Sequence, residues 1–348
     1  MKCISCYAPL TETFSLGNLY ISNFIPSDHK SSDYPKSDLT LLACSHCGLG
    51  RLKESINPDT LYNKYWYYSG INLTMRLALK NVVDACLDSV KSEPDDIWLD
   101  IASNDNTLLN IVPQSFRKIG IDPSNVAIES ITPSRCTILH DFFSKTAYKN
   151  IYKTQAKFIT CIAMFYDLEN PHQFLEDVRD ILRDDGLFVI QISYTPLMFK
   201  QLEFANICAE HLYFYNLENL RHLLLRHGLY VQDVELNDIN GGSFRVYCTK
   251  QDNTHFRNLQ QRDVASIRIE TLEYFESDQY HLDDWNGFGE NIDILKEQVV
   301  SFIKSEVNNG KTVYGLGAST KGNTLLQYFG LDNTLITKIA ERNPVKHG

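Results

Sequence analysis

Four cysteines near the N-terminus form two Cys-x-x-Cys pairs, Cys3/Cys6 and Cys44/Cys47. Each pair places two thiolates on one side of a tight turn, and two such turns supply the four sulfur ligands that zinc prefers. A redox motif would be one pair beside a βαβ unit, and a disulfide pair needs an oxidising compartment, of which the sequence holds no sign. We therefore predict a structural zinc ion held by these four cysteines, with no position open for water or substrate.

The bulk composition is that of a globular chain. Its 348 residues are enough for two or three domains with cores of their own. Of nine cysteines, five lie outside the two pairs, and an odd number of scattered thiols favours a reducing cytoplasm over secretion. There is no membrane-length apolar run and no signal-peptide pattern. A net charge of −10 without a Lys/Arg cluster argues against binding nucleic acid polymers. We expect a cytoplasmic protein.

Changes of pattern along the chain predict three consecutive domains. Residues 1–60 hold the cysteine pairs. From 61 to 250, short apolar strands alternate with amphipathic helices, which predicts an α/β domain with a doubly wound, mostly parallel sheet closed by an antiparallel pair at 230–235 and 243–248. From 251 to 348, long polar helices precede a strand, a glycine loop and a helix, a Rossmann-like order of elements.

Polar side chains stand where three strands of the central domain are expected to end. The strand at 97–101 runs into a small-residue loop at 102–106, the next strand ends at Asp122, and the third leads to Asp141 and Phe142. Ligands of open α/β sheets bind beyond the carboxyl ends of the strands. Asp122 is therefore placed for ribose hydroxyls, and Asp141 with Phe142 for an adenine. The loop has neither phosphate-binding glycine pattern, so we expect a cofactor without a phosphate group.

Five short motifs follow the cysteine pairs in a defined order. They are Tyr67-x-Ser69-Gly70, Ser103-Asn104-Asp105, Glu210-His211, Gly241-Gly242-Ser243-x-Arg245-Val246-Tyr247 and Gly317-Ala318-x-x-Lys321-Gly322-Asn323-Thr324. This order resembles the three-part sugar C-methyltransferases over essentially the whole chain. The resemblance implies S-adenosylmethionine-dependent methylation of a carbon of a nucleotide-linked 4-keto-deoxysugar. It also implies an N-terminal zinc-binding domain, a central class I methyltransferase domain and a C-terminal Rossmann-like domain that helps to hold the nucleotide-sugar.

The chain departs from the family pattern at several positions. Asn106 stands where the cofactor loop usually has glycine, and Asn is the next-best residue for a left-handed backbone. Ala102 replaces another frequent glycine. The segment Cys208-Ala209-Glu210-His211 lacks one of two family histidines. The family's last domain usually runs on past the counterpart of Asn343-Pro344, so with an end at Gly348 we expect this domain to be incomplete.

The resemblance also implies roles for particular residues. His211 is the expected base that removes the proton beside the ketone, since imidazole titrates near neutrality, and Glu210 and Tyr67 complete the catalytic set. The cofactor set is Ser69, Asp100, Ala102, Asn104, Asp105, Asp122, Pro123, Asp141, Phe142 and Tyr166. The substrate set is Cys208, Tyr213, Arg245, Lys321 and Asn323, with Lys321 expected at the diphosphate. Structural roles stay open for His211, Tyr67, Tyr166 and Tyr213.

Other functions fit the same residues to different degrees. A methyltransferase of this fold could act on another small ketone or on an O or N acceptor, because a fold does not determine the chemistry. Asn106 and Ala209 fit a catalytically impaired scaffold as well. A nicotinamide oxidoreductase is disfavoured, because Gly315-x-Gly317-x-x-x-x-Gly322 is not the dinucleotide fingerprint and no acidic residue is expected at a strand end about 20 positions further on.

Overall fold

The computed structural model describes residues 1–21, 29–62, 65–251, 256–257, 259–277, 282–343 and 346–347. Pro344 and Gly348, which bear on the expected end of the last domain, lie outside these ranges. The chain divides into two compact units. The first gathers Met1–Ile56, Thr195–Phe214 and Gln279–Gly348, and the second consists of Asn57–Tyr194 and Tyr215–Asp278. These units cut across the three consecutive domains expected from the sequence, because two later segments pack with the N-terminal residues.

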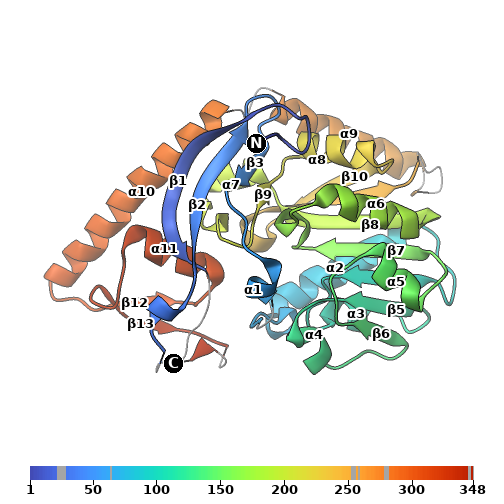
Figure 1. Ribbon diagram of the computed structural model, residues 1–348, viewed down its shortest axis with the longest axis horizontal. Coiled ribbons are helices and arrows are strands. Elements are labelled where there is room, and N and C mark those ends of the chain that lie inside the picture. Colours follow the sequence, from blue (N-terminus) through green and yellow to red (C-terminus); the bar gives the residue numbers. More distant parts are fainter. Residues whose placement is uncertain are drawn as a thin grey trace. The chain divides into compact units, whose positions relative to one another are not determined.

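A seven-stranded mixed sheet forms the centre of the second unit (Figure 1). Its strands, in order across the sheet, are β10 (Tyr230–Asn237), β11 (Ser243–Thr249), β8 (Leu182–Ser193), β7 (Ala156–Ile162), β4 (Ile97–Ile101), β5 (Arg117–Ile121) and β6 (Cys136–Leu139). Neighbours from β8 to β6 run parallel, whereas β11 is antiparallel to both β8 and β10. This arrangement confirms the predicted doubly wound sheet closed by an antiparallel pair.

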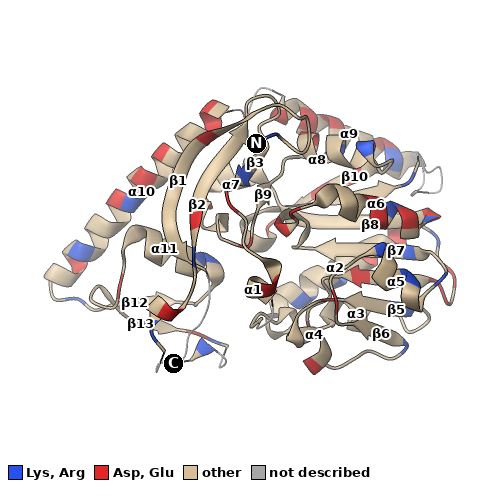
Figure 2. Cartoon of the chain, in the orientation of Figure 1, with Lys and Arg blue, Asp and Glu red and all other residues tan. Residues whose placement is uncertain are grey.

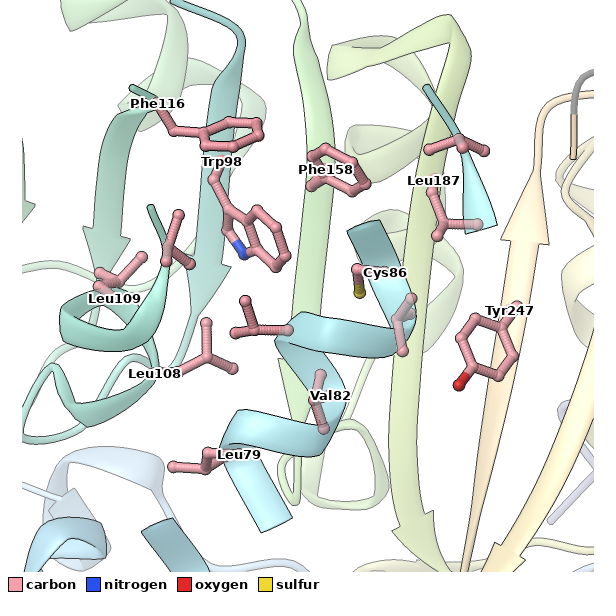
Figure 3. Close-up of a cluster of buried hydrophobic side chains, with 14 of the residues drawn as sticks. Leu79, Val82, Cys86, Trp98, Leu108, Leu109, Phe116, Phe158, Leu187 and Tyr247 are labelled. Carbon is pink, nitrogen blue, oxygen red and sulfur yellow. The ribbon is translucent and has the colours of Figure 1, made fainter. Parts of the chain in front are cut away.

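Aromatic packing forms the core of this unit. Trp98 on β4 is fully buried and stacks on Phe158 of β7, with ring centroids 4.5 Å apart, while Phe116 meets both rings edge-on. Figure 3 shows Leu79 and Val82 of α2 (Leu73–Ser89) in the same cluster of buried side chains. Truncating one such aromatic side chain to alanine typically costs about 3–5 kcal/mol. The apolar face of α2 thus packs on the sheet.

The second unit also contains helices and 3-10 turns. The helices are α1 (Pro58–Tyr62), α2, α3 (Thr107–Ile111), α4 (Asn125–Glu129), α5 (Lys145–Ile151), α6 (Pro171–Ile181), α8 (Leu217–Arg226) and α9 (Leu259–Glu276), and the 3-10 turns are η2 (Ser69–Ile71), η3 (Phe165–Asp167) and η5 (Ile239–Gly241). Buried Glu276 accepts hydrogen bonds from the backbone amides of Leu217 and Glu218, so a carboxylate stabilises the N-terminus of α8.

An antiparallel sheet forms the centre of the first unit. Its order is β1 (Leu10–Tyr20), β2 (Lys36–Cys44), β3 (Gly50–Leu52) and β9 (Tyr213–Phe214), with α7 (Thr195–Gln201), η1 (Ser31–Asp33) and η4 (Phe204–Asn206) in the same unit. These strands were not predicted from the sequence. The pairing of β1 with β2 contains two register shifts, which interrupt the side-chain alternation that marks a strand.

One tryptophan anchors α10 (Leu282–Asn308) to the cysteine-bearing turn. The indole of Trp285 is fully buried and donates a 2.9 Å hydrogen bond to the carbonyl of Gly48. A Cβ atom on Gly50 would come within 2.2 Å of the same ring, so only glycine fits there. Phe199 meets the indole edge-on at 4.7 Å between centroids. A helix from the last part of the chain therefore fixes the second cysteine turn.

The remaining C-terminal elements are β12 (Val313–Leu316), α11 (Thr320–Phe329) and β13 (Ile336–Ala340), and the two strands run parallel. The Ser319 side chain accepts a bond from the amide of Gly322 at the start of α11. Gln327 on α11 exchanges two hydrogen bonds with the backbone of Tyr20, which ties this helix to β1. Acidic and basic residues are interspersed along α10 (Figure 2). Within the described ranges, every helix is too short or too polar to cross a membrane.

Candidate active site

The four N-terminal cysteines converge. Their sulfur atoms all lie within 4.8 Å of one another, with 3.6 Å between Cys3 and Cys47 and 3.3 Å between Cys6 and Cys44. These separations exceed the S–S bond length, and all nine cysteines are free thiols. Four sulfurs held about 2.3 Å from one tetrahedral zinc ion would lie about 3.8 Å apart. The amides of Ser5 and His46 point to sulfur atoms within the two turns, so the donor set fits a zinc ion.

The loop after β4 has an unusual backbone. Ala102, Asn104 and Asn106 all adopt left-handed conformations, with φ values of +59°, +48° and +61°. Asn106 therefore takes the backbone conformation expected at the position of the family's glycine. Its side chain also donates to the carbonyl of Ala127 and accepts from Ser103, and the residue is fully buried. The asparagine thus supplies bonds that glycine could not.

Two of the sequence motifs interlock through this loop. The Asn104 amide oxygen accepts hydrogen bonds from the backbone amide and the hydroxyl of Ser69, and its nitrogen donates to the carbonyl of Tyr67. The Asp105 carboxylate accepts from the amide of Gly70 at 2.7 Å. Residues 35 positions apart in the sequence are thereby held together, so the two motifs lie next to each other in the fold.

Two carboxylates lie at the ends of neighbouring strands below the loop. Asp122, directly after β5, accepts hydrogen bonds from the amide of Asn104 and from the amide and hydroxyl of Ser124. Asp100, the penultimate residue of β4, is buried and accepts a 2.6 Å bond from Thr160. Burial raises the pKa of Asp100 to about 7, the Thr160 bond opposes this, and the charge of Asp122 adds to it.

The other predicted cofactor residues occupy the expected strand ends. Asp141 and Phe142 follow β6 and are both exposed, and the Asp141 carboxylate accepts from the Phe142 amide. Pro123 follows Asp122 directly. Tyr166 is buried in η3, which follows β7. The pKa of Tyr67 is raised by burial and by the charge of Asp105.

A second polar group of residues lies in the first unit. We call it the histidine cluster, and it consists of Glu203, Asn206, Cys208, Glu210, His211 and Lys321. His211 Nδ1 lies 2.7 Å from the backbone carbonyl of Asn206. A carbonyl oxygen can only accept, so Nδ1 carries the proton and the lone pair of the neutral imidazole is on Nε2. The ammonium of Lys321 lies 3.8 Å from the carboxylate of Glu203.

Burial controls the charge states in the histidine cluster. It lowers the pKa of His211 to about 4, the Asn206 carbonyl opposes this, and the positive charge of Lys321 lowers the pKa further. It also raises the pKa of Glu210 and lowers that of Lys321. Both side-chain polar atoms of Asn206 and one carboxylate oxygen of Glu210 are buried and lack a hydrogen-bond partner among the described residues. The imidazole is thus neutral at pH 7, and the histidine cluster also contains buried polar atoms without a hydrogen-bond partner among the described residues.

The remaining predicted substrate residues are mostly internal. Arg245 is buried on β11, and its guanidinium bonds to Gln191, Asn81 and the hydroxyl of Tyr247. Tyr213 is buried on β9 under the guanidinium of Arg51. Asn323 is partly buried in the first turns of α11. The bonds of Arg245 favour a structural role, so its substrate contact stays a prediction.

Three residues were not identified from the sequence. Glu203 and Asn206 stand in an apolar segment ahead of Glu210-His211, and only that position could have drawn attention to them. Glu341 directly follows β13, 24 positions after Gly317, so the expectation of no acidic residue at a strand end was wrong. Its carboxylate accepts from the amides of Ala318 and Asn343. The strand was missed because β13 is short and largely exposed.

Comparison with known proteins adds two family matches. Residues 72–234 match a family model described as a methyltransferase domain, and residues 238–348 match one described as the C-methyltransferase C-terminal domain. The chain is also 26% identical over 314 residues to the C-methyltransferase NovU of Streptomyces niveus, an alignment that covers 89% of this chain and 73% of that protein.

Solved methyltransferase structures resemble the chain more distantly. The N-methyltransferase NodS from Bradyrhizobium japonicum shares 12% identity, covering 52% of this chain and 98% of its own, with a TM-score of 0.39. The magnesium protoporphyrin IX methyltransferase from Synechocystis shares 10% identity over 54% and 82%, also with a TM-score of 0.39. The methyltransferase-domain match and the sheet order together identify the chain as an S-adenosylmethionine-dependent methyltransferase of the class I fold, whose residues 238–348 are similar to the C-terminal domain of C-methyltransferases.

Proposed function

We propose that the protein methylates a carbon next to the ketone of a nucleotide-linked 4-keto-deoxysugar. The single observation that best supports this is the state of His211. A base for an α-proton must be unprotonated at the working pH, and a neutral imidazole that carries its proton on Nδ1 and its lone pair on Nε2 meets this requirement. The proton moves to Nε2, and the carbon–hydrogen electron pair passes into the enolate. Glu210 lies beside the base in sequence and would hold a sugar hydroxyl.

The loop 102–106 would hold the cofactor in the second unit. S-adenosylmethionine supplies an electrophilic methyl group when it is bound. Asp122 would accept the ribose hydroxyls, and its carboxylate is oriented for this by three protein donors. Phe142, which is exposed after β6, offers a ring face for the adenine, with Asp141 beside it. Hydrogen bonds with Asn104 hold Tyr67 and Ser69 against the same loop.

We further propose that Cys3, Cys6, Cys44 and Cys47 hold one structural zinc ion. The four thiolates fill a tetrahedral shell, so the ion would stabilise the turns and take no part in the chemistry. The anchoring of the second turn by Trp285 suits this role. Metal analysis of the freshly purified protein should give one zinc per chain, whereas a value well below one would contradict the proposal.

Deuterium exchange tests the proposed reaction without requiring methyl transfer. A nucleoside-diphosphate-linked 4-keto-6-deoxyhexose is incubated in D2O with the wild-type protein and S-adenosylhomocysteine, and exchange beside the ketone is followed by mass spectrometry. We expect exchange in the wild type and a loss of about 10²–10⁴-fold in His211→Ala, the usual contribution of a positioned base. Cofactor affinity, measured by calorimetry, should be unchanged in this variant.

Other outcomes lead to different functions. If the wild type shows no exchange but methylates an alcohol or an amine, the protein acts on an O or N acceptor. If exchange persists in His211→Ala, the base is another residue, with Tyr67 and Glu210 next in order.

A further inference from the structure

Lys321 has a carboxylate and the proposed base in its surroundings, as well as the glycine-rich segment. It stands in the first turn of α11, in the glycine-rich segment that suggested a phosphate site. Within the first unit, however, its ammonium lies 3.8 Å from the Glu203 carboxylate, and its charge acts on His211 and on the thiol of Cys208. α11 therefore places a cation beside Glu203 and within electrostatic range of His211, the side chain that is expected to remove a proton.

A cation beside a catalytic base is unfavourable unless an anion forms between them. When His211 takes up a proton, the imidazolium and the Lys321 ammonium repel each other in a partly buried setting. If the proton comes from carbon next to a ketone, the electron pair moves onto the ketone oxygen. That negative charge would then lie near two positive groups. The juxtaposition thus suits a reaction that creates an oxyanion.

The neighbouring side chains also indicate that a polar ligand binds here. Asn206 is only 1% exposed, yet neither polar atom of its side chain has a partner in the described part of the chain. One carboxylate oxygen of Glu210 is in the same condition. Burying such groups without partners is costly, and native proteins rarely tolerate it without a functional reason. A sugar with several hydroxyls and a ketone could satisfy all three atoms.

We propose that Lys321 is a catalytic residue that stabilises the enolate oxygen during proton abstraction by His211, instead of serving as an anchor for the diphosphate. This inference rests on the proposed function. In the step concerned, the carbon–hydrogen bond breaks and the proton bonds to Nε2 of His211. The electron pair forms the carbon–carbon double bond, and the carbonyl π electrons move to oxygen, beside the ammonium. Glu203 orients Lys321 and is a positioning residue.

The test separates catalysis from diphosphate binding. Lys321→Met and Lys321→Arg are compared with the wild type in the D2O exchange assay at saturating sugar nucleotide, and the affinities for UDP and dTDP are measured by calorimetry. We expect exchange to fall by about 10²–10³-fold in Lys321→Met, as for loss of an oxyanion donor, with partial recovery in Lys321→Arg. The affinities for UDP and dTDP should change less than threefold. Lys338→Met, which removes an exposed cation from β13, is the control and should leave all values unchanged.

A pH profile provides a second readout that a structural role would not move. Because Lys321 lowers the pKa of His211, its removal should move the acidic limb of the exchange profile to higher pH. Glu203→Gln should move the same limb to lower pH. The carboxylate that offsets the charge of Lys321 is then absent, so the pKa of His211 falls further. Opposite shifts in the two variants would support the proposal.

Contrary results are readily distinguished. Unchanged saturated exchange in Lys321→Met, together with a tenfold or greater loss of UDP and dTDP affinity, would restore the diphosphate role and overturn the inference while leaving the proposed function intact. A wild-type protein that exchanges no proton from the 4-keto sugar would overturn the proposed function itself. If Lys321→Met loses both exchange and the folded state, the pH profile of Glu203→Gln becomes the test. An acidic limb that does not shift in Glu203→Gln would overturn the inference.

Discussion

The cofactor loop and the histidine cluster satisfy their polar groups in opposite ways. In the loop, Asn104, Asp105 and Asn106 direct their side chains at backbone groups of the same unit, and each has protein partners. In the histidine cluster, Asn206 and Glu210 bury polar atoms that no described residue satisfies. The comparison indicates that the protein itself determines the form of the loop before a cofactor binds, whereas the proposed substrate would complete the cluster. Four substitutions test this difference.

The largest effect is expected for Asn104→Ala. This change removes three hydrogen bonds that hold Tyr67 and Ser69 to the loop, and leaves backbone groups without partners. Each bond contributes about 1 kcal/mol, so we expect the free energy of unfolding to fall by roughly 3 kcal/mol and S-adenosylhomocysteine to bind more than tenfold more weakly. Urea unfolding and calorimetry measure both. The exposed Asn150→Ala serves as the control, and an equal loss there would mean that the loop is not self-supporting.

Asp100→Asn should alter the pH dependence of stability. Because the folded protein holds the pKa of Asp100 at about 7, the folded state binds a proton that the unfolded state has released from about pH 4 upward. Stability therefore falls between pH 4 and pH 7 and then levels off. Asn cannot ionise, so the variant should lack this fall and be more stable than the wild type at pH 7.5. A curve parallel to that of the wild type between pH 4 and 7.5 would exclude a raised pKa, with exposed Asp88→Asn as the control.

Asn206→Leu probes the other side of the comparison. Leucine has a similar size and no polar atoms, so removal of an unsatisfied amide should raise the free energy of unfolding by about 1–2 kcal/mol. The same change should reduce turnover, because the substrate can then no longer form hydrogen bonds with the Asn206 amide. Asn216→Leu is the matched control, since that buried side chain accepts from the amide of Asn219 and its loss should destabilise the protein. Destabilisation by both substitutions would show that Asn206 is satisfied after all.

The smallest effect is expected for Ala102→Gly. At a φ of +59°, alanine carries a strain of about 1 kcal/mol that glycine does not, which the greater chain entropy of glycine partly offsets. We expect a gain of about 0.5 kcal/mol in urea unfolding. Ala85→Gly, in the middle of α2, should instead lose about 1 kcal/mol. A loss at both positions would indicate that the left-handed loop is not strained.

Features that depend on a regular pattern of neighbouring residues could be predicted from the sequence. The strands and helices of the central sheet followed from the spacing of their apolar residues, and the polar residues at the strand ends followed from the parallel topology. The conformation of Asn106 followed from the properties of asparagine, and it was confirmed. The convergence of Cys3, Cys6, Cys44 and Cys47 followed from their paired spacing.

Long-range packing accounts for what could not be predicted. Nothing in the residues around Trp285 indicates that its indole bonds to Gly48. The neighbours of Lys321 in the sequence suggest a diphosphate anchor, whereas its proximity to Glu203 depends on how α11 packs. The partnerless amide of Asn206 is a property of its surroundings, which a sequence pattern does not contain.

The discontinuity of the first unit affects how the protein can be made. During translation, the second unit has all its residues once Asp278 has left the ribosome, whereas the cysteine turns emerge first and must wait for Trp285. The nascent N-terminal strands thus stay without their helix through most of synthesis. A shortened chain ending before α10 would never bury Gly50, so we expect that the two units cannot be separated by a single cut in the gene. The two units differ in their proposed roles, but their segments alternate along the sequence.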